Sequence, residues 1–317
     1  MRAHFVLPLL ACFLWASSAD AQKKLVFGDV AAVAPSWPIM VAEKNGFFAD
    51  EHLAVETIYT GNNVSVVQQV VGGSLDIGNT TFETALRAIG SGAPIAMVGS
   101  QTLKFPYSVM AAPAVQRPSD LAGKRIILPF KKSPLTAFWD RWTAEHGLAA
   151  GSVDQVYDGA TPNRFAALVS GTVEAAALTQ PFDLMAAGRG YHKILDYAAY
   201  ASGLGFTAFV ARHDWLAANG DAMRAYLRAV ARAVGFLYDP ANRQGAIDAL
   251  TASTKVDAGT AGLVYDYYAT ELRPFDPGLA LPDQNIVQGL AEIREVGDLP
   301  PGDHPVANYI DRRYLPR

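Results

Sequence analysis

The order of secondary-structure signals is repeated along this chain, and the repeat constrains the fold more than any single motif does. In the first copy, strand-like runs lie at 25–28, 53–60 and 74–78, and each is followed by a helix-like run. In the second copy, strand-like runs lie at 123–129, 153–159 and 172–181, with helix-like runs between them. Alternating strands and helices form parallel sheets that helices cover. We therefore expect an α/β protein with two similar three-layer α/β lobes.

A short stretch of sequence supports the duplication directly. Residues 73–77, Gly-Ser-Leu-Asp-Ile, match residues 171–175, Gly-Thr-Val-Glu-Ala, in residue type at an offset of 98 residues (171 minus 73). A match of this length can arise by chance. The prediction therefore depends mainly on the repeated order of elements, which also favours a mostly parallel sheet in each lobe.

Capping residues and glycines mark the ends of the expected helices in the first copy. Asn62 or Asn63 can cap a helix that stops at Gly72, although its many valines leave a strand open as the alternative. The apolar residues at helical spacing in this segment are Val64, Val67 and Val71. The run from Thr80 to Glu83 fits a capping box for the next helix.

In the second copy, two helices are expected to begin at a capping residue followed by proline, because proline fits the first turn of a helix. These starts are Ser133-Pro134 and Thr161-Pro162. The first of these helices has apolar side chains at helical spacing, namely Leu135, Phe138 and Trp142. We expect this face to be buried in the second lobe.

Two segments with glycine and proline, 107–123 and 201–215, are expected to contain the crossings between the lobes. The predicted first lobe comprises 22–110 and 206–317, and the predicted second lobe comprises 111–205. The remainder of the chain is predicted to be helical at 221–238, 243–250, 258–272 and 284–296.

The first of these C-terminal helices has two contrasting faces. Its apolar stripe consists of Leu227, Val230, Val234 and Leu237. Its basic face consists of Arg224, Arg228 and Arg232. We interpret these as a core face and a solvated face, with docking onto a partner as the alternative.

The first 21 residues have the features of a secretory signal peptide. They contain one early arginine, an apolar core from Phe5 to Trp15 and a small-x-small pattern at 19–21. The alternatives are a membrane anchor, for which the apolar core is short, and a lipoprotein signal at Cys12. We expect cleavage after residue 21 and a periplasmic location. Cys12 is the only cysteine, so the mature chain would have no disulfide and no thiolate metal site.

Polar residues recur at one kind of position, the carboxyl end of an expected strand just before a helix begins. Ligands bind at this edge of α/β sheets because helix N-termini offer unpaired N–H groups and a partial positive charge. The candidate ligand-binding residues are Ser36, Trp37, Asn62, Asn63, Asn79, Thr80, Thr81, Lys132, Ser133, Thr136 and Gln180. Each of them alone is more often a helix cap, so the prediction depends on their clustering.

Three side chains bear on the kind of ligand. Trp37 can stack on a planar ligand or pack between helix and sheet. Lys132 and Arg164 lie near helix starts and could reach an anion, although a solvated surface charge is the alternative for each. The helix N-termini favour a small organic anion such as a sulfonate or carboxylate, whereas Trp37 and the amides keep a neutral heteroaromatic ligand open.

The sequence contains no recognisable catalytic or metal-binding pattern. The histidines are scattered without zinc-site spacing, and no phosphate-binding loop or nucleophile elbow is present. The net charge of −4 has interspersed signs and offers no basic face for nucleic acid. We expect no cofactor. An enzyme on the same scaffold, the alternative, would use a carboxylate among Asp76, Asp158 and Asp183.

Five segments, in order, carry a resemblance to a known family. They are VAEKNGFFADEHLAVETI, VVGGSLDIGNTTFETALRAIGSGAPIAMVGS, RPSDLAGKRIILP, NRFAALVSGTVEAAALTQPFD and VARHDWLAAN. From about residue 25 to residue 238, the chain resembles the ABC-transporter solute-binding proteins of the sulfonate, taurine, nitrate and thiamine-pyrimidine group.

The resemblance implies a type II periplasmic binding protein, whose two lobes are joined by a two-crossing hinge and close on a small solute. The solute would then pass to an ABC transporter permease in the inner membrane, and the same candidate residues would line the cleft. We expect a monomer. The pyrimidine-synthesising eukaryotic relatives depend on a cysteine-rich motif that this sequence lacks, which argues against that activity. An enzyme on this scaffold and a ligand-presenting sensor for a membrane receptor are the alternatives.

Overall fold

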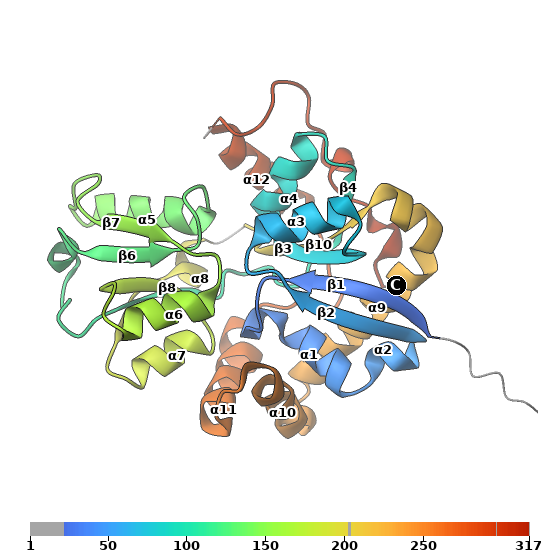
Figure 1. The fold of residues 1–317 in the computed structure, drawn as a ribbon, viewed down its shortest axis with the longest axis horizontal. Coiled ribbons are helices and arrows are strands. Elements are labelled where there is room, and N and C mark those ends of the chain that lie inside the picture. The colour runs from blue at the N-terminus through green and yellow to red at the C-terminus, as the bar shows by residue number, and fades with distance from the viewer. Residues whose placement is uncertain (1–21, 202–203, 296, 317) are drawn as a thin grey trace, which may run out of the picture.

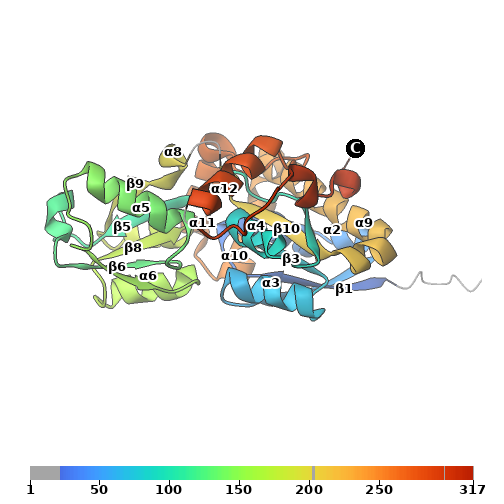
Figure 2. The ribbon, with the colours of Figure 1, turned by 90° about the horizontal axis from the view of Figure 1, so that it is seen from above.

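The computed structural model describes residues 22–201, 204–295 and 297–316, in which two five-stranded sheets are surrounded by helices (Figure 1). The strand order is β2-β1-β3-β10-β4 in the first sheet and β7-β6-β8-β5-β9 in the second. The two sheets lie toward opposite ends of the long axis of the molecule (Figure 2). We call the parts built on them the first and second lobes. The prediction of two α/β lobes is confirmed, whereas the predicted signal peptide lies outside the described residues.

The strands are short and mostly buried. Those of the first sheet are β1 (Lys23–Asp29), β2 (Leu53–Tyr59), β3 (Ile77–Thr81), β4 (Ile95–Gly99) and β10 (Thr207–Arg212). Those of the second sheet are β5 (Tyr107–Ala111), β6 (Arg125–Leu128), β7 (Asp154–Tyr157), β8 (Ala175–Thr179) and β9 (His192–Asp196).

The two sheets have the same topology, which confirms the duplication. In the first lobe β1 pairs in parallel with β2 and β3, and in the second lobe β6 pairs in parallel with β7 and β8. Each sheet then contains one antiparallel strand, β10 in the first and β5 in the second. Each of these strands directly follows a crossing, so each lobe receives one strand from the segment that connects it to the other lobe.

The predicted boundary at residue 110 needs correction. Residues 107–111 form β5, which pairs with β8 and β9 and is therefore part of the second sheet. The first crossing thus lies between Gly99, where β4 ends, and Tyr107. A strand-like run indicates a strand but not the sheet it joins, which is why the sequence placed this segment in the first lobe.

The first-lobe helices follow the predicted order with two differences. Asn62 caps α3 (Asn63–Gly72), but Val64 is 51% exposed, and the buried valines of this helix are Val66, Val67 and Val70. A helix with valine on several sides has no single apolar stripe to identify the buried face. The predicted capping box at Thr80 does not form, because β3 continues to Thr81 and α4 (Phe82–Gly90) begins without a side-chain cap.

The second-lobe helices begin close to the predicted positions. Ser133 caps α5 (Pro134–Glu145) by accepting a hydrogen bond from Thr136 N at 3.1 Å, and the predicted apolar face of α5 is buried. Thr161 is the first residue of α6 (Thr161–Val169) and not its cap. The remaining helices of this lobe are α7 (Phe182–Ala187) and α8 (Tyr197–Tyr200).

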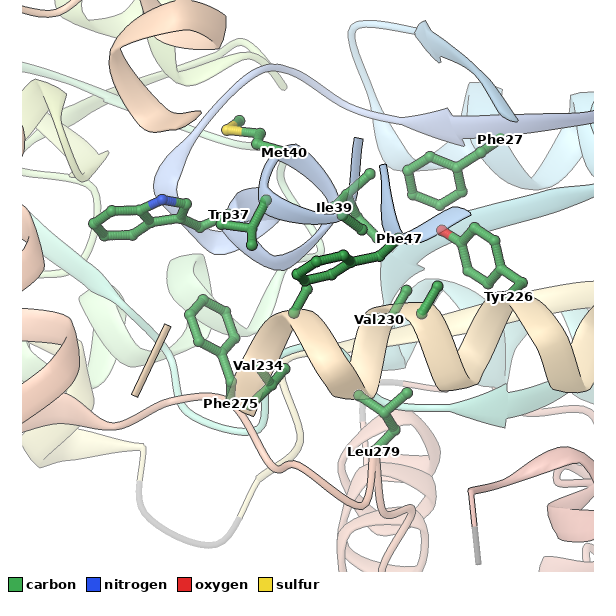
Figure 3. Close-up of a cluster of buried hydrophobic side chains, with 14 of the residues drawn as sticks. Phe27, Trp37, Ile39, Met40, Phe47, Tyr226, Val230, Val234, Phe275 and Leu279 are labelled. Carbon is green, nitrogen blue, oxygen red and sulfur yellow. The ribbon is translucent and has the colours of Figure 1, made fainter. Parts of the chain in front are cut away.

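The C-terminal helices pack onto the first lobe. They are α9 (His213–Tyr238), α10 (Arg243–Thr254), α11 (Ala258–Asp266), a π-helical turn (Tyr267–Leu272) and α12 (Asp283–Glu295). The apolar stripe of α9 packs against α1 (Trp37–Lys44) and α2 (Phe47–Asp50) in a core that Figure 3 shows. On the opposite face, Arg228 and Arg232 form ion pairs with Glu51 and Asp50, each at 2.6 Å. This confirms the core-face interpretation.

The described residues include no helix that combines the length and the apolar character needed to cross a bilayer.

Candidate functional site

A cavity lies between the two lobes, at the carboxyl ends of the parallel strands. Its lining comes from both lobes and from both crossings, and its empty space is about 650 Å³ including its open mouth. The polar residues that line it are Asp29, Ser36, Asn63, Asn79, Thr81, Glu83, Tyr107, Ser133, Thr161 and Thr207. This is the edge of the sheets at which open α/β folds bind ligands.

Asp29 is the polar residue at the end of β1, and it is 4% exposed. Ser36 Oγ donates to its carboxylate at 2.6 Å, the main-chain N–H of Val30 donates at 2.7 Å, and Asn79 Nδ2 lies 3.2 Å from both carboxylate oxygens. Burial raises the pKa of Asp29 to about 6, although these hydrogen bonds oppose the shift. Asp29 therefore organises the Ser36 and Asn79 side chains at the carboxyl edge of the first sheet.

A second group of polar residues connects β3 with the start of α3. Asn63 Oδ1 accepts hydrogen bonds from Thr81 N at 3.1 Å and from Thr80 Oγ1 at 3.3 Å. Thr81 Oγ1 lies 2.8 Å from Thr84 Oγ1. These bonds hold the Asn63 and Thr81 side chains in place on the cavity wall.

Glu83 is a buried acid in the first turn of α4, and it is 6% exposed. Its Oε1 atom is buried, and no described residue forms a hydrogen bond with it. Burial raises the pKa of Glu83 to about 7. A carboxylate in this state either takes up a proton or accepts hydrogen bonds from a bound molecule.

The second lobe contributes hydroxyl groups and a rigid corner. Ser133 and Thr161 line the cavity at the starts of α5 and α6. Arg164 is fully buried, and its guanidinium donates to Ala177 O, Asp158 O, Gly159 O and Thr161 Oγ1 at 2.7 to 2.8 Å. Arg164 thus fixes the corner before α6, and its guanidinium lies 5.8 Å from the ring centroid of Tyr107, which lines the cavity.

Aromatic side chains from the crossings form one wall. Phe206 lies between Phe105, at a ring-centroid distance of 5.0 Å, and Tyr107, at 5.6 Å. All three line the cavity together with Phe130 from the second lobe. The cavity therefore combines an apolar aromatic wall with a polar wall, as small-molecule sites generally do.

The structure brings together five of the candidate residues predicted from the sequence. Those that line the cavity are Ser36, Asn63, Asn79, Thr81 and Ser133. Those that do not line it are Trp37, Asn62, Thr80, Lys132, Thr136 and Gln180.

Trp37 lies in the core of the first lobe and not on the cavity wall. It is fully buried, its Nε1 donates to Ala246 O at 2.8 Å, and its ring packs against Tyr265 and Tyr268. Figure 3 shows Trp37 beside Phe275 within this core. The packing interpretation of Trp37 is confirmed, and the stacking interpretation is corrected, because α10 and α11 cover a face that the sequence could not show to be covered.

Lys132 and Gln180 are also engaged elsewhere. Lys132 forms an ion pair with Asp298 of the first lobe, outside the cavity. The Gln180 amide donates to Asp183 at 2.5 Å and accepts from the Tyr268 hydroxyl at 3.1 Å. Both residues therefore connect the lobes.

The other three candidate residues that do not line the cavity have structural roles. Asn62 caps α3 through Ser65 N, at 2.8 Å, and Thr136 Oγ1 donates to Phe130 O at 2.8 Å. Thr80 donates to Asn63. Each supports a neighbouring cavity residue, because capping side chains and cleft side chains occupy adjacent positions at a helix start.

Sequence reasoning missed Asp29, Glu83 and Thr207. Asp29 ends the first strand and precedes Ser36, so its position at a strand end was the available signal. Glu83 was interpreted only as part of a capping box. The acids that were considered instead are structural in the fold, since Asp76 accepts from Val26 N at 2.9 Å and Asp158 accepts from Ala160 N at 2.8 Å.

Within the described residues, no group of three or more histidine, cysteine, aspartate or glutamate side chains could hold a metal ion.

Known proteins share this fold. A solved protein of Bordetella bronchiseptica RB50 is 21% identical with a TM-score of 0.73, over 93% of this chain and 96% of that chain. The alkanesulfonate-binding protein SsuA of Xanthomonas axonopodis pv. citri, bound to MOPS, is 20% identical with a TM-score of 0.70, over 89% and 96%. The nitrate-binding protein NrtA of Synechocystis PCC 6803 is 16% identical with a TM-score of 0.67, over 88% and 83%.

These neighbours show that the fold is that of periplasmic binding proteins, as the sequence resemblance implied. No curated protein sequence matches the chain. Residues 35–243, well over half of the chain, match the NMT1/THI5-like family. The chain therefore belongs to the NMT1/THI5-like family.

Proposed function

We propose that this protein binds a small organic solute in the interlobe cavity and delivers it to an ABC transporter permease. The observation that supports this most directly is the cavity itself, which both lobes line and which contains buried polar atoms without a partner in the described part of the chain. The proposed ligand contacts are Asp29, Ser36, Asn63, Asn79, Thr81, Glu83, Ser133, Thr161 and Thr207. On this proposal, the mature chain acts as a monomer in the periplasm after removal of residues 1–21.

Closure of the lobes around the solute is the proposed mechanism. Several contacts join the lobes beside the cavity: Gln180 O accepts from Ala34 N at 3.0 Å, Lys132 pairs with Asp298, and Gly159 packs against Gly61 and Asn62. A solute that is held by both lobes favours the closed form by its difference in affinity for the two forms. Roughly 5.5 kcal/mol of this difference converts a mostly open population into a mostly closed one.

Small-angle X-ray scattering tests this mechanism. The solute is obtained by denaturing protein purified from the periplasm and identifying the released small molecules by mass spectrometry. Adding it back to solute-free protein should reduce the radius of gyration. An unchanged radius with a bound solute would contradict closure.

We further infer that the solute leaves the cavity chemically unchanged. Asp183, one of the acids considered for catalysis, is occupied by Gln180 and by the main-chain N–H of Leu184 at 2.7 Å. Incubation of the protein with its solute, followed by mass spectrometry, should return the solute unmodified. Conversion with turnover would indicate an enzyme instead.

A further inference from the structure

The charged side chains that line the cavity are both acidic. They are Asp29 and Glu83, each less than a tenth exposed. The two cations that the sequence offered for an anionic ligand are engaged elsewhere, Lys132 with Asp298 and Arg164 with oxygen atoms of the second lobe. An anion entering the cavity would therefore lie near two acids, and among the described residues no cationic side chain is part of the lining, Arg164 lying behind Tyr107.

The polar atoms left without a partner at the cavity are mainly acceptors. Asn79 Oδ1, Glu83 Oε1 and Thr207 Oγ1 are buried and have no hydrogen-bond partner among the residues that the structure describes. The orientation of the Asn79 amide follows from Asp29, because its Nδ2 group is within 3.2 Å of both Asp29 oxygens. Asn79 therefore presents its carbonyl oxygen as an acceptor. Buried acceptors of this kind are costly unless a donor meets them.

Four main-chain N–H groups at the first-lobe edge of the cavity are already used within the protein. Ala34 N donates to Gln180 O, Ser36 N to Val33 O, and Phe82 N to Phe206 O, all at 2.9 to 3.0 Å. Thr81 N donates to Asn63 Oδ1 at 3.1 Å. These helix starts in the first lobe, which favoured an anion when only the sequence was considered, therefore do not offer these groups to one.

The apolar wall is suited to a positively charged or planar group. Phe105 and Phe206 pack together on it, whereas the ring of the neighbouring Tyr107 already has Arg164 over it at 5.8 Å. Aromatic faces attract ammonium, amidinium and guanidinium groups, especially where water is excluded. Two acids and an aromatic wall therefore line the same cavity.

We propose that the cavity selects a small organic cation that carries at least two N–H donors on an apolar or aromatic body, in place of the anion expected from the helix starts. The N–H groups would meet Asn79 Oδ1 and Glu83 Oε1, the negative charge of Asp29 would attract the cation from behind Asn79, and the body would lie against Phe206. This ligand class rests on the proposed solute-binding function.

The environment of the two acids makes the binding pH-dependent. Glu43 from α1 and Tyr59 and Tyr226 from β2 and α9 interact electrostatically with Asp29. Arg87 on α4 and Glu292 on α12 interact with Glu83, and Lys131, Lys132 and Asp140 line the adjacent groove.

Burial raises the pKa of Asp29 to about 6 and that of Glu83 to about 7. Both acids ionise as the pH rises, so affinity for a permanent cation should rise from about pH 5 to about pH 8.

Three compounds with the same ring test the ligand class: benzamidine, a cation with several N–H donors, benzamide, which is neutral, and benzenesulfonate, an anion. Calorimetry and thermal-shift measurements on the full chain should show benzamidine binding, which strengthens as the pH rises. Glu83→Gln should weaken it by about tenfold or more, because hydrogen bonds to charged groups contribute at least this factor. Asp29→Asn should also weaken it, because it removes a negative charge beside the cavity and the carboxylate that orients the Asn79 amide. Glu56→Gln, which removes an exposed acid from β2, should have no effect.

Binding of benzenesulfonate but not benzamidine would overturn the proposed ligand class, and so would benzamidine binding that neither acid affects. Failure of benzamidine to bind would overturn it as well. A protein that closes on its co-purified solute while rejecting benzamidine would retain the solute-binding function and lose only the cationic ligand class. A protein that neither carries a solute nor closes would lose both.

Discussion

The side-chain amide of Asn79 lies with its Nδ2 atom 3.2 Å from both carboxylate oxygens of Asp29, and its Oδ1 atom is buried without a hydrogen-bond partner in residues 22–201, 204–295 and 297–316. The two residues come from neighbouring strands, β3 and β1. Asp29 therefore determines which end of the Asn79 amide is available to a ligand. This relationship links the fold of the first sheet to the selectivity of the cavity.

Asn79→Ala should weaken solute binding by about tenfold while the protein stays folded, because it removes a single hydrogen-bond acceptor of the ligand. Calorimetric titration with the co-purified solute measures the loss. Asn45→Ala is the matched control, since Asn45 donates to Val41 O at 2.9 Å at the end of α1, away from the cavity. Equal affinity in the wild type and Asn79→Ala would show that Asn79 is only structural.

Gly159→Ala should hinder closure. A Cβ atom at this position would lie 2.8 Å from Gly61 O and 2.9 Å from Asn62 Cβ, both in the opposite lobe. The lobes can separate to relieve this clash, so we expect a larger radius of gyration with solute present and weaker binding, with little change in stability. Gly72→Ala, where nothing lies within 4 Å of the added atom, is the control. If Gly159→Ala closed as the wild type does, Gly159 would not lie against Gly61 and Asn62 in the closed form.

Trp37 substitutions should affect stability and not affinity, because the side chain is buried in the core. Trp37→Ala should lower the free energy of unfolding by about 3 to 5 kcal/mol. Trp37→Phe keeps a ring but loses the hydrogen bond to Ala246 O, and it should bind the solute as the wild type does. If folded Trp37→Phe bound the solute more weakly than the wild type, Trp37 would contact the ligand and the stacking interpretation would be correct.

The two cavity acids should make stability depend on pH in a defined direction. Burial raises the pKa of Asp29 from 3.8 to about 6, so the folded protein holds a proton that the unfolded chain has already released. This contribution is fully present below about pH 4 and is lost as the pH rises through 6, and it amounts to about 3 kcal/mol. The free energy of unfolding of solute-free Asp29→Asn, relative to that of the wild type, should therefore increase as the pH rises from about 4 to about 6.

Glu83→Gln should show the same effect at a higher pH, because the pKa of Glu83 is raised from 4.5 to about 7. Urea denaturation of both variants and the wild type at several pH values measures the differences. Stability differences that do not change with pH would show that these carboxyls are not buried from solvent.

The architecture was largely predictable because it depends on periodic patterns. The repeated strand and helix order, the start of α5 at Ser133-Pro134 and the apolar stripe of α9 are local signals, and the structure agrees with them. The sheet that β5 joins was not predictable, because a strand-like run carries no information about its partner. For the same reason, the predicted boundary between the lobes at residue 110 was wrong.

The cavity was only partly predictable for a related reason. Ser36 and Asn79 follow strand ends and reach the cavity, whereas Trp37, adjacent to Ser36, points into the core. Adjacent residues at a helix start point in different directions, and only the packing of α10 and α11 decides which side is covered. Asp29 and Glu83 were missed because buried acids look like surface acids in sequence.

The most direct test is a crystal structure of the protein with its co-purified solute. We predict density for the solute between the lobes, within hydrogen-bond distance of Asn79 Oδ1 and Glu83 Oε1 and against the ring of Phe206. A solute bound elsewhere, with this cavity filled by the protein's own side chains, would contradict the account.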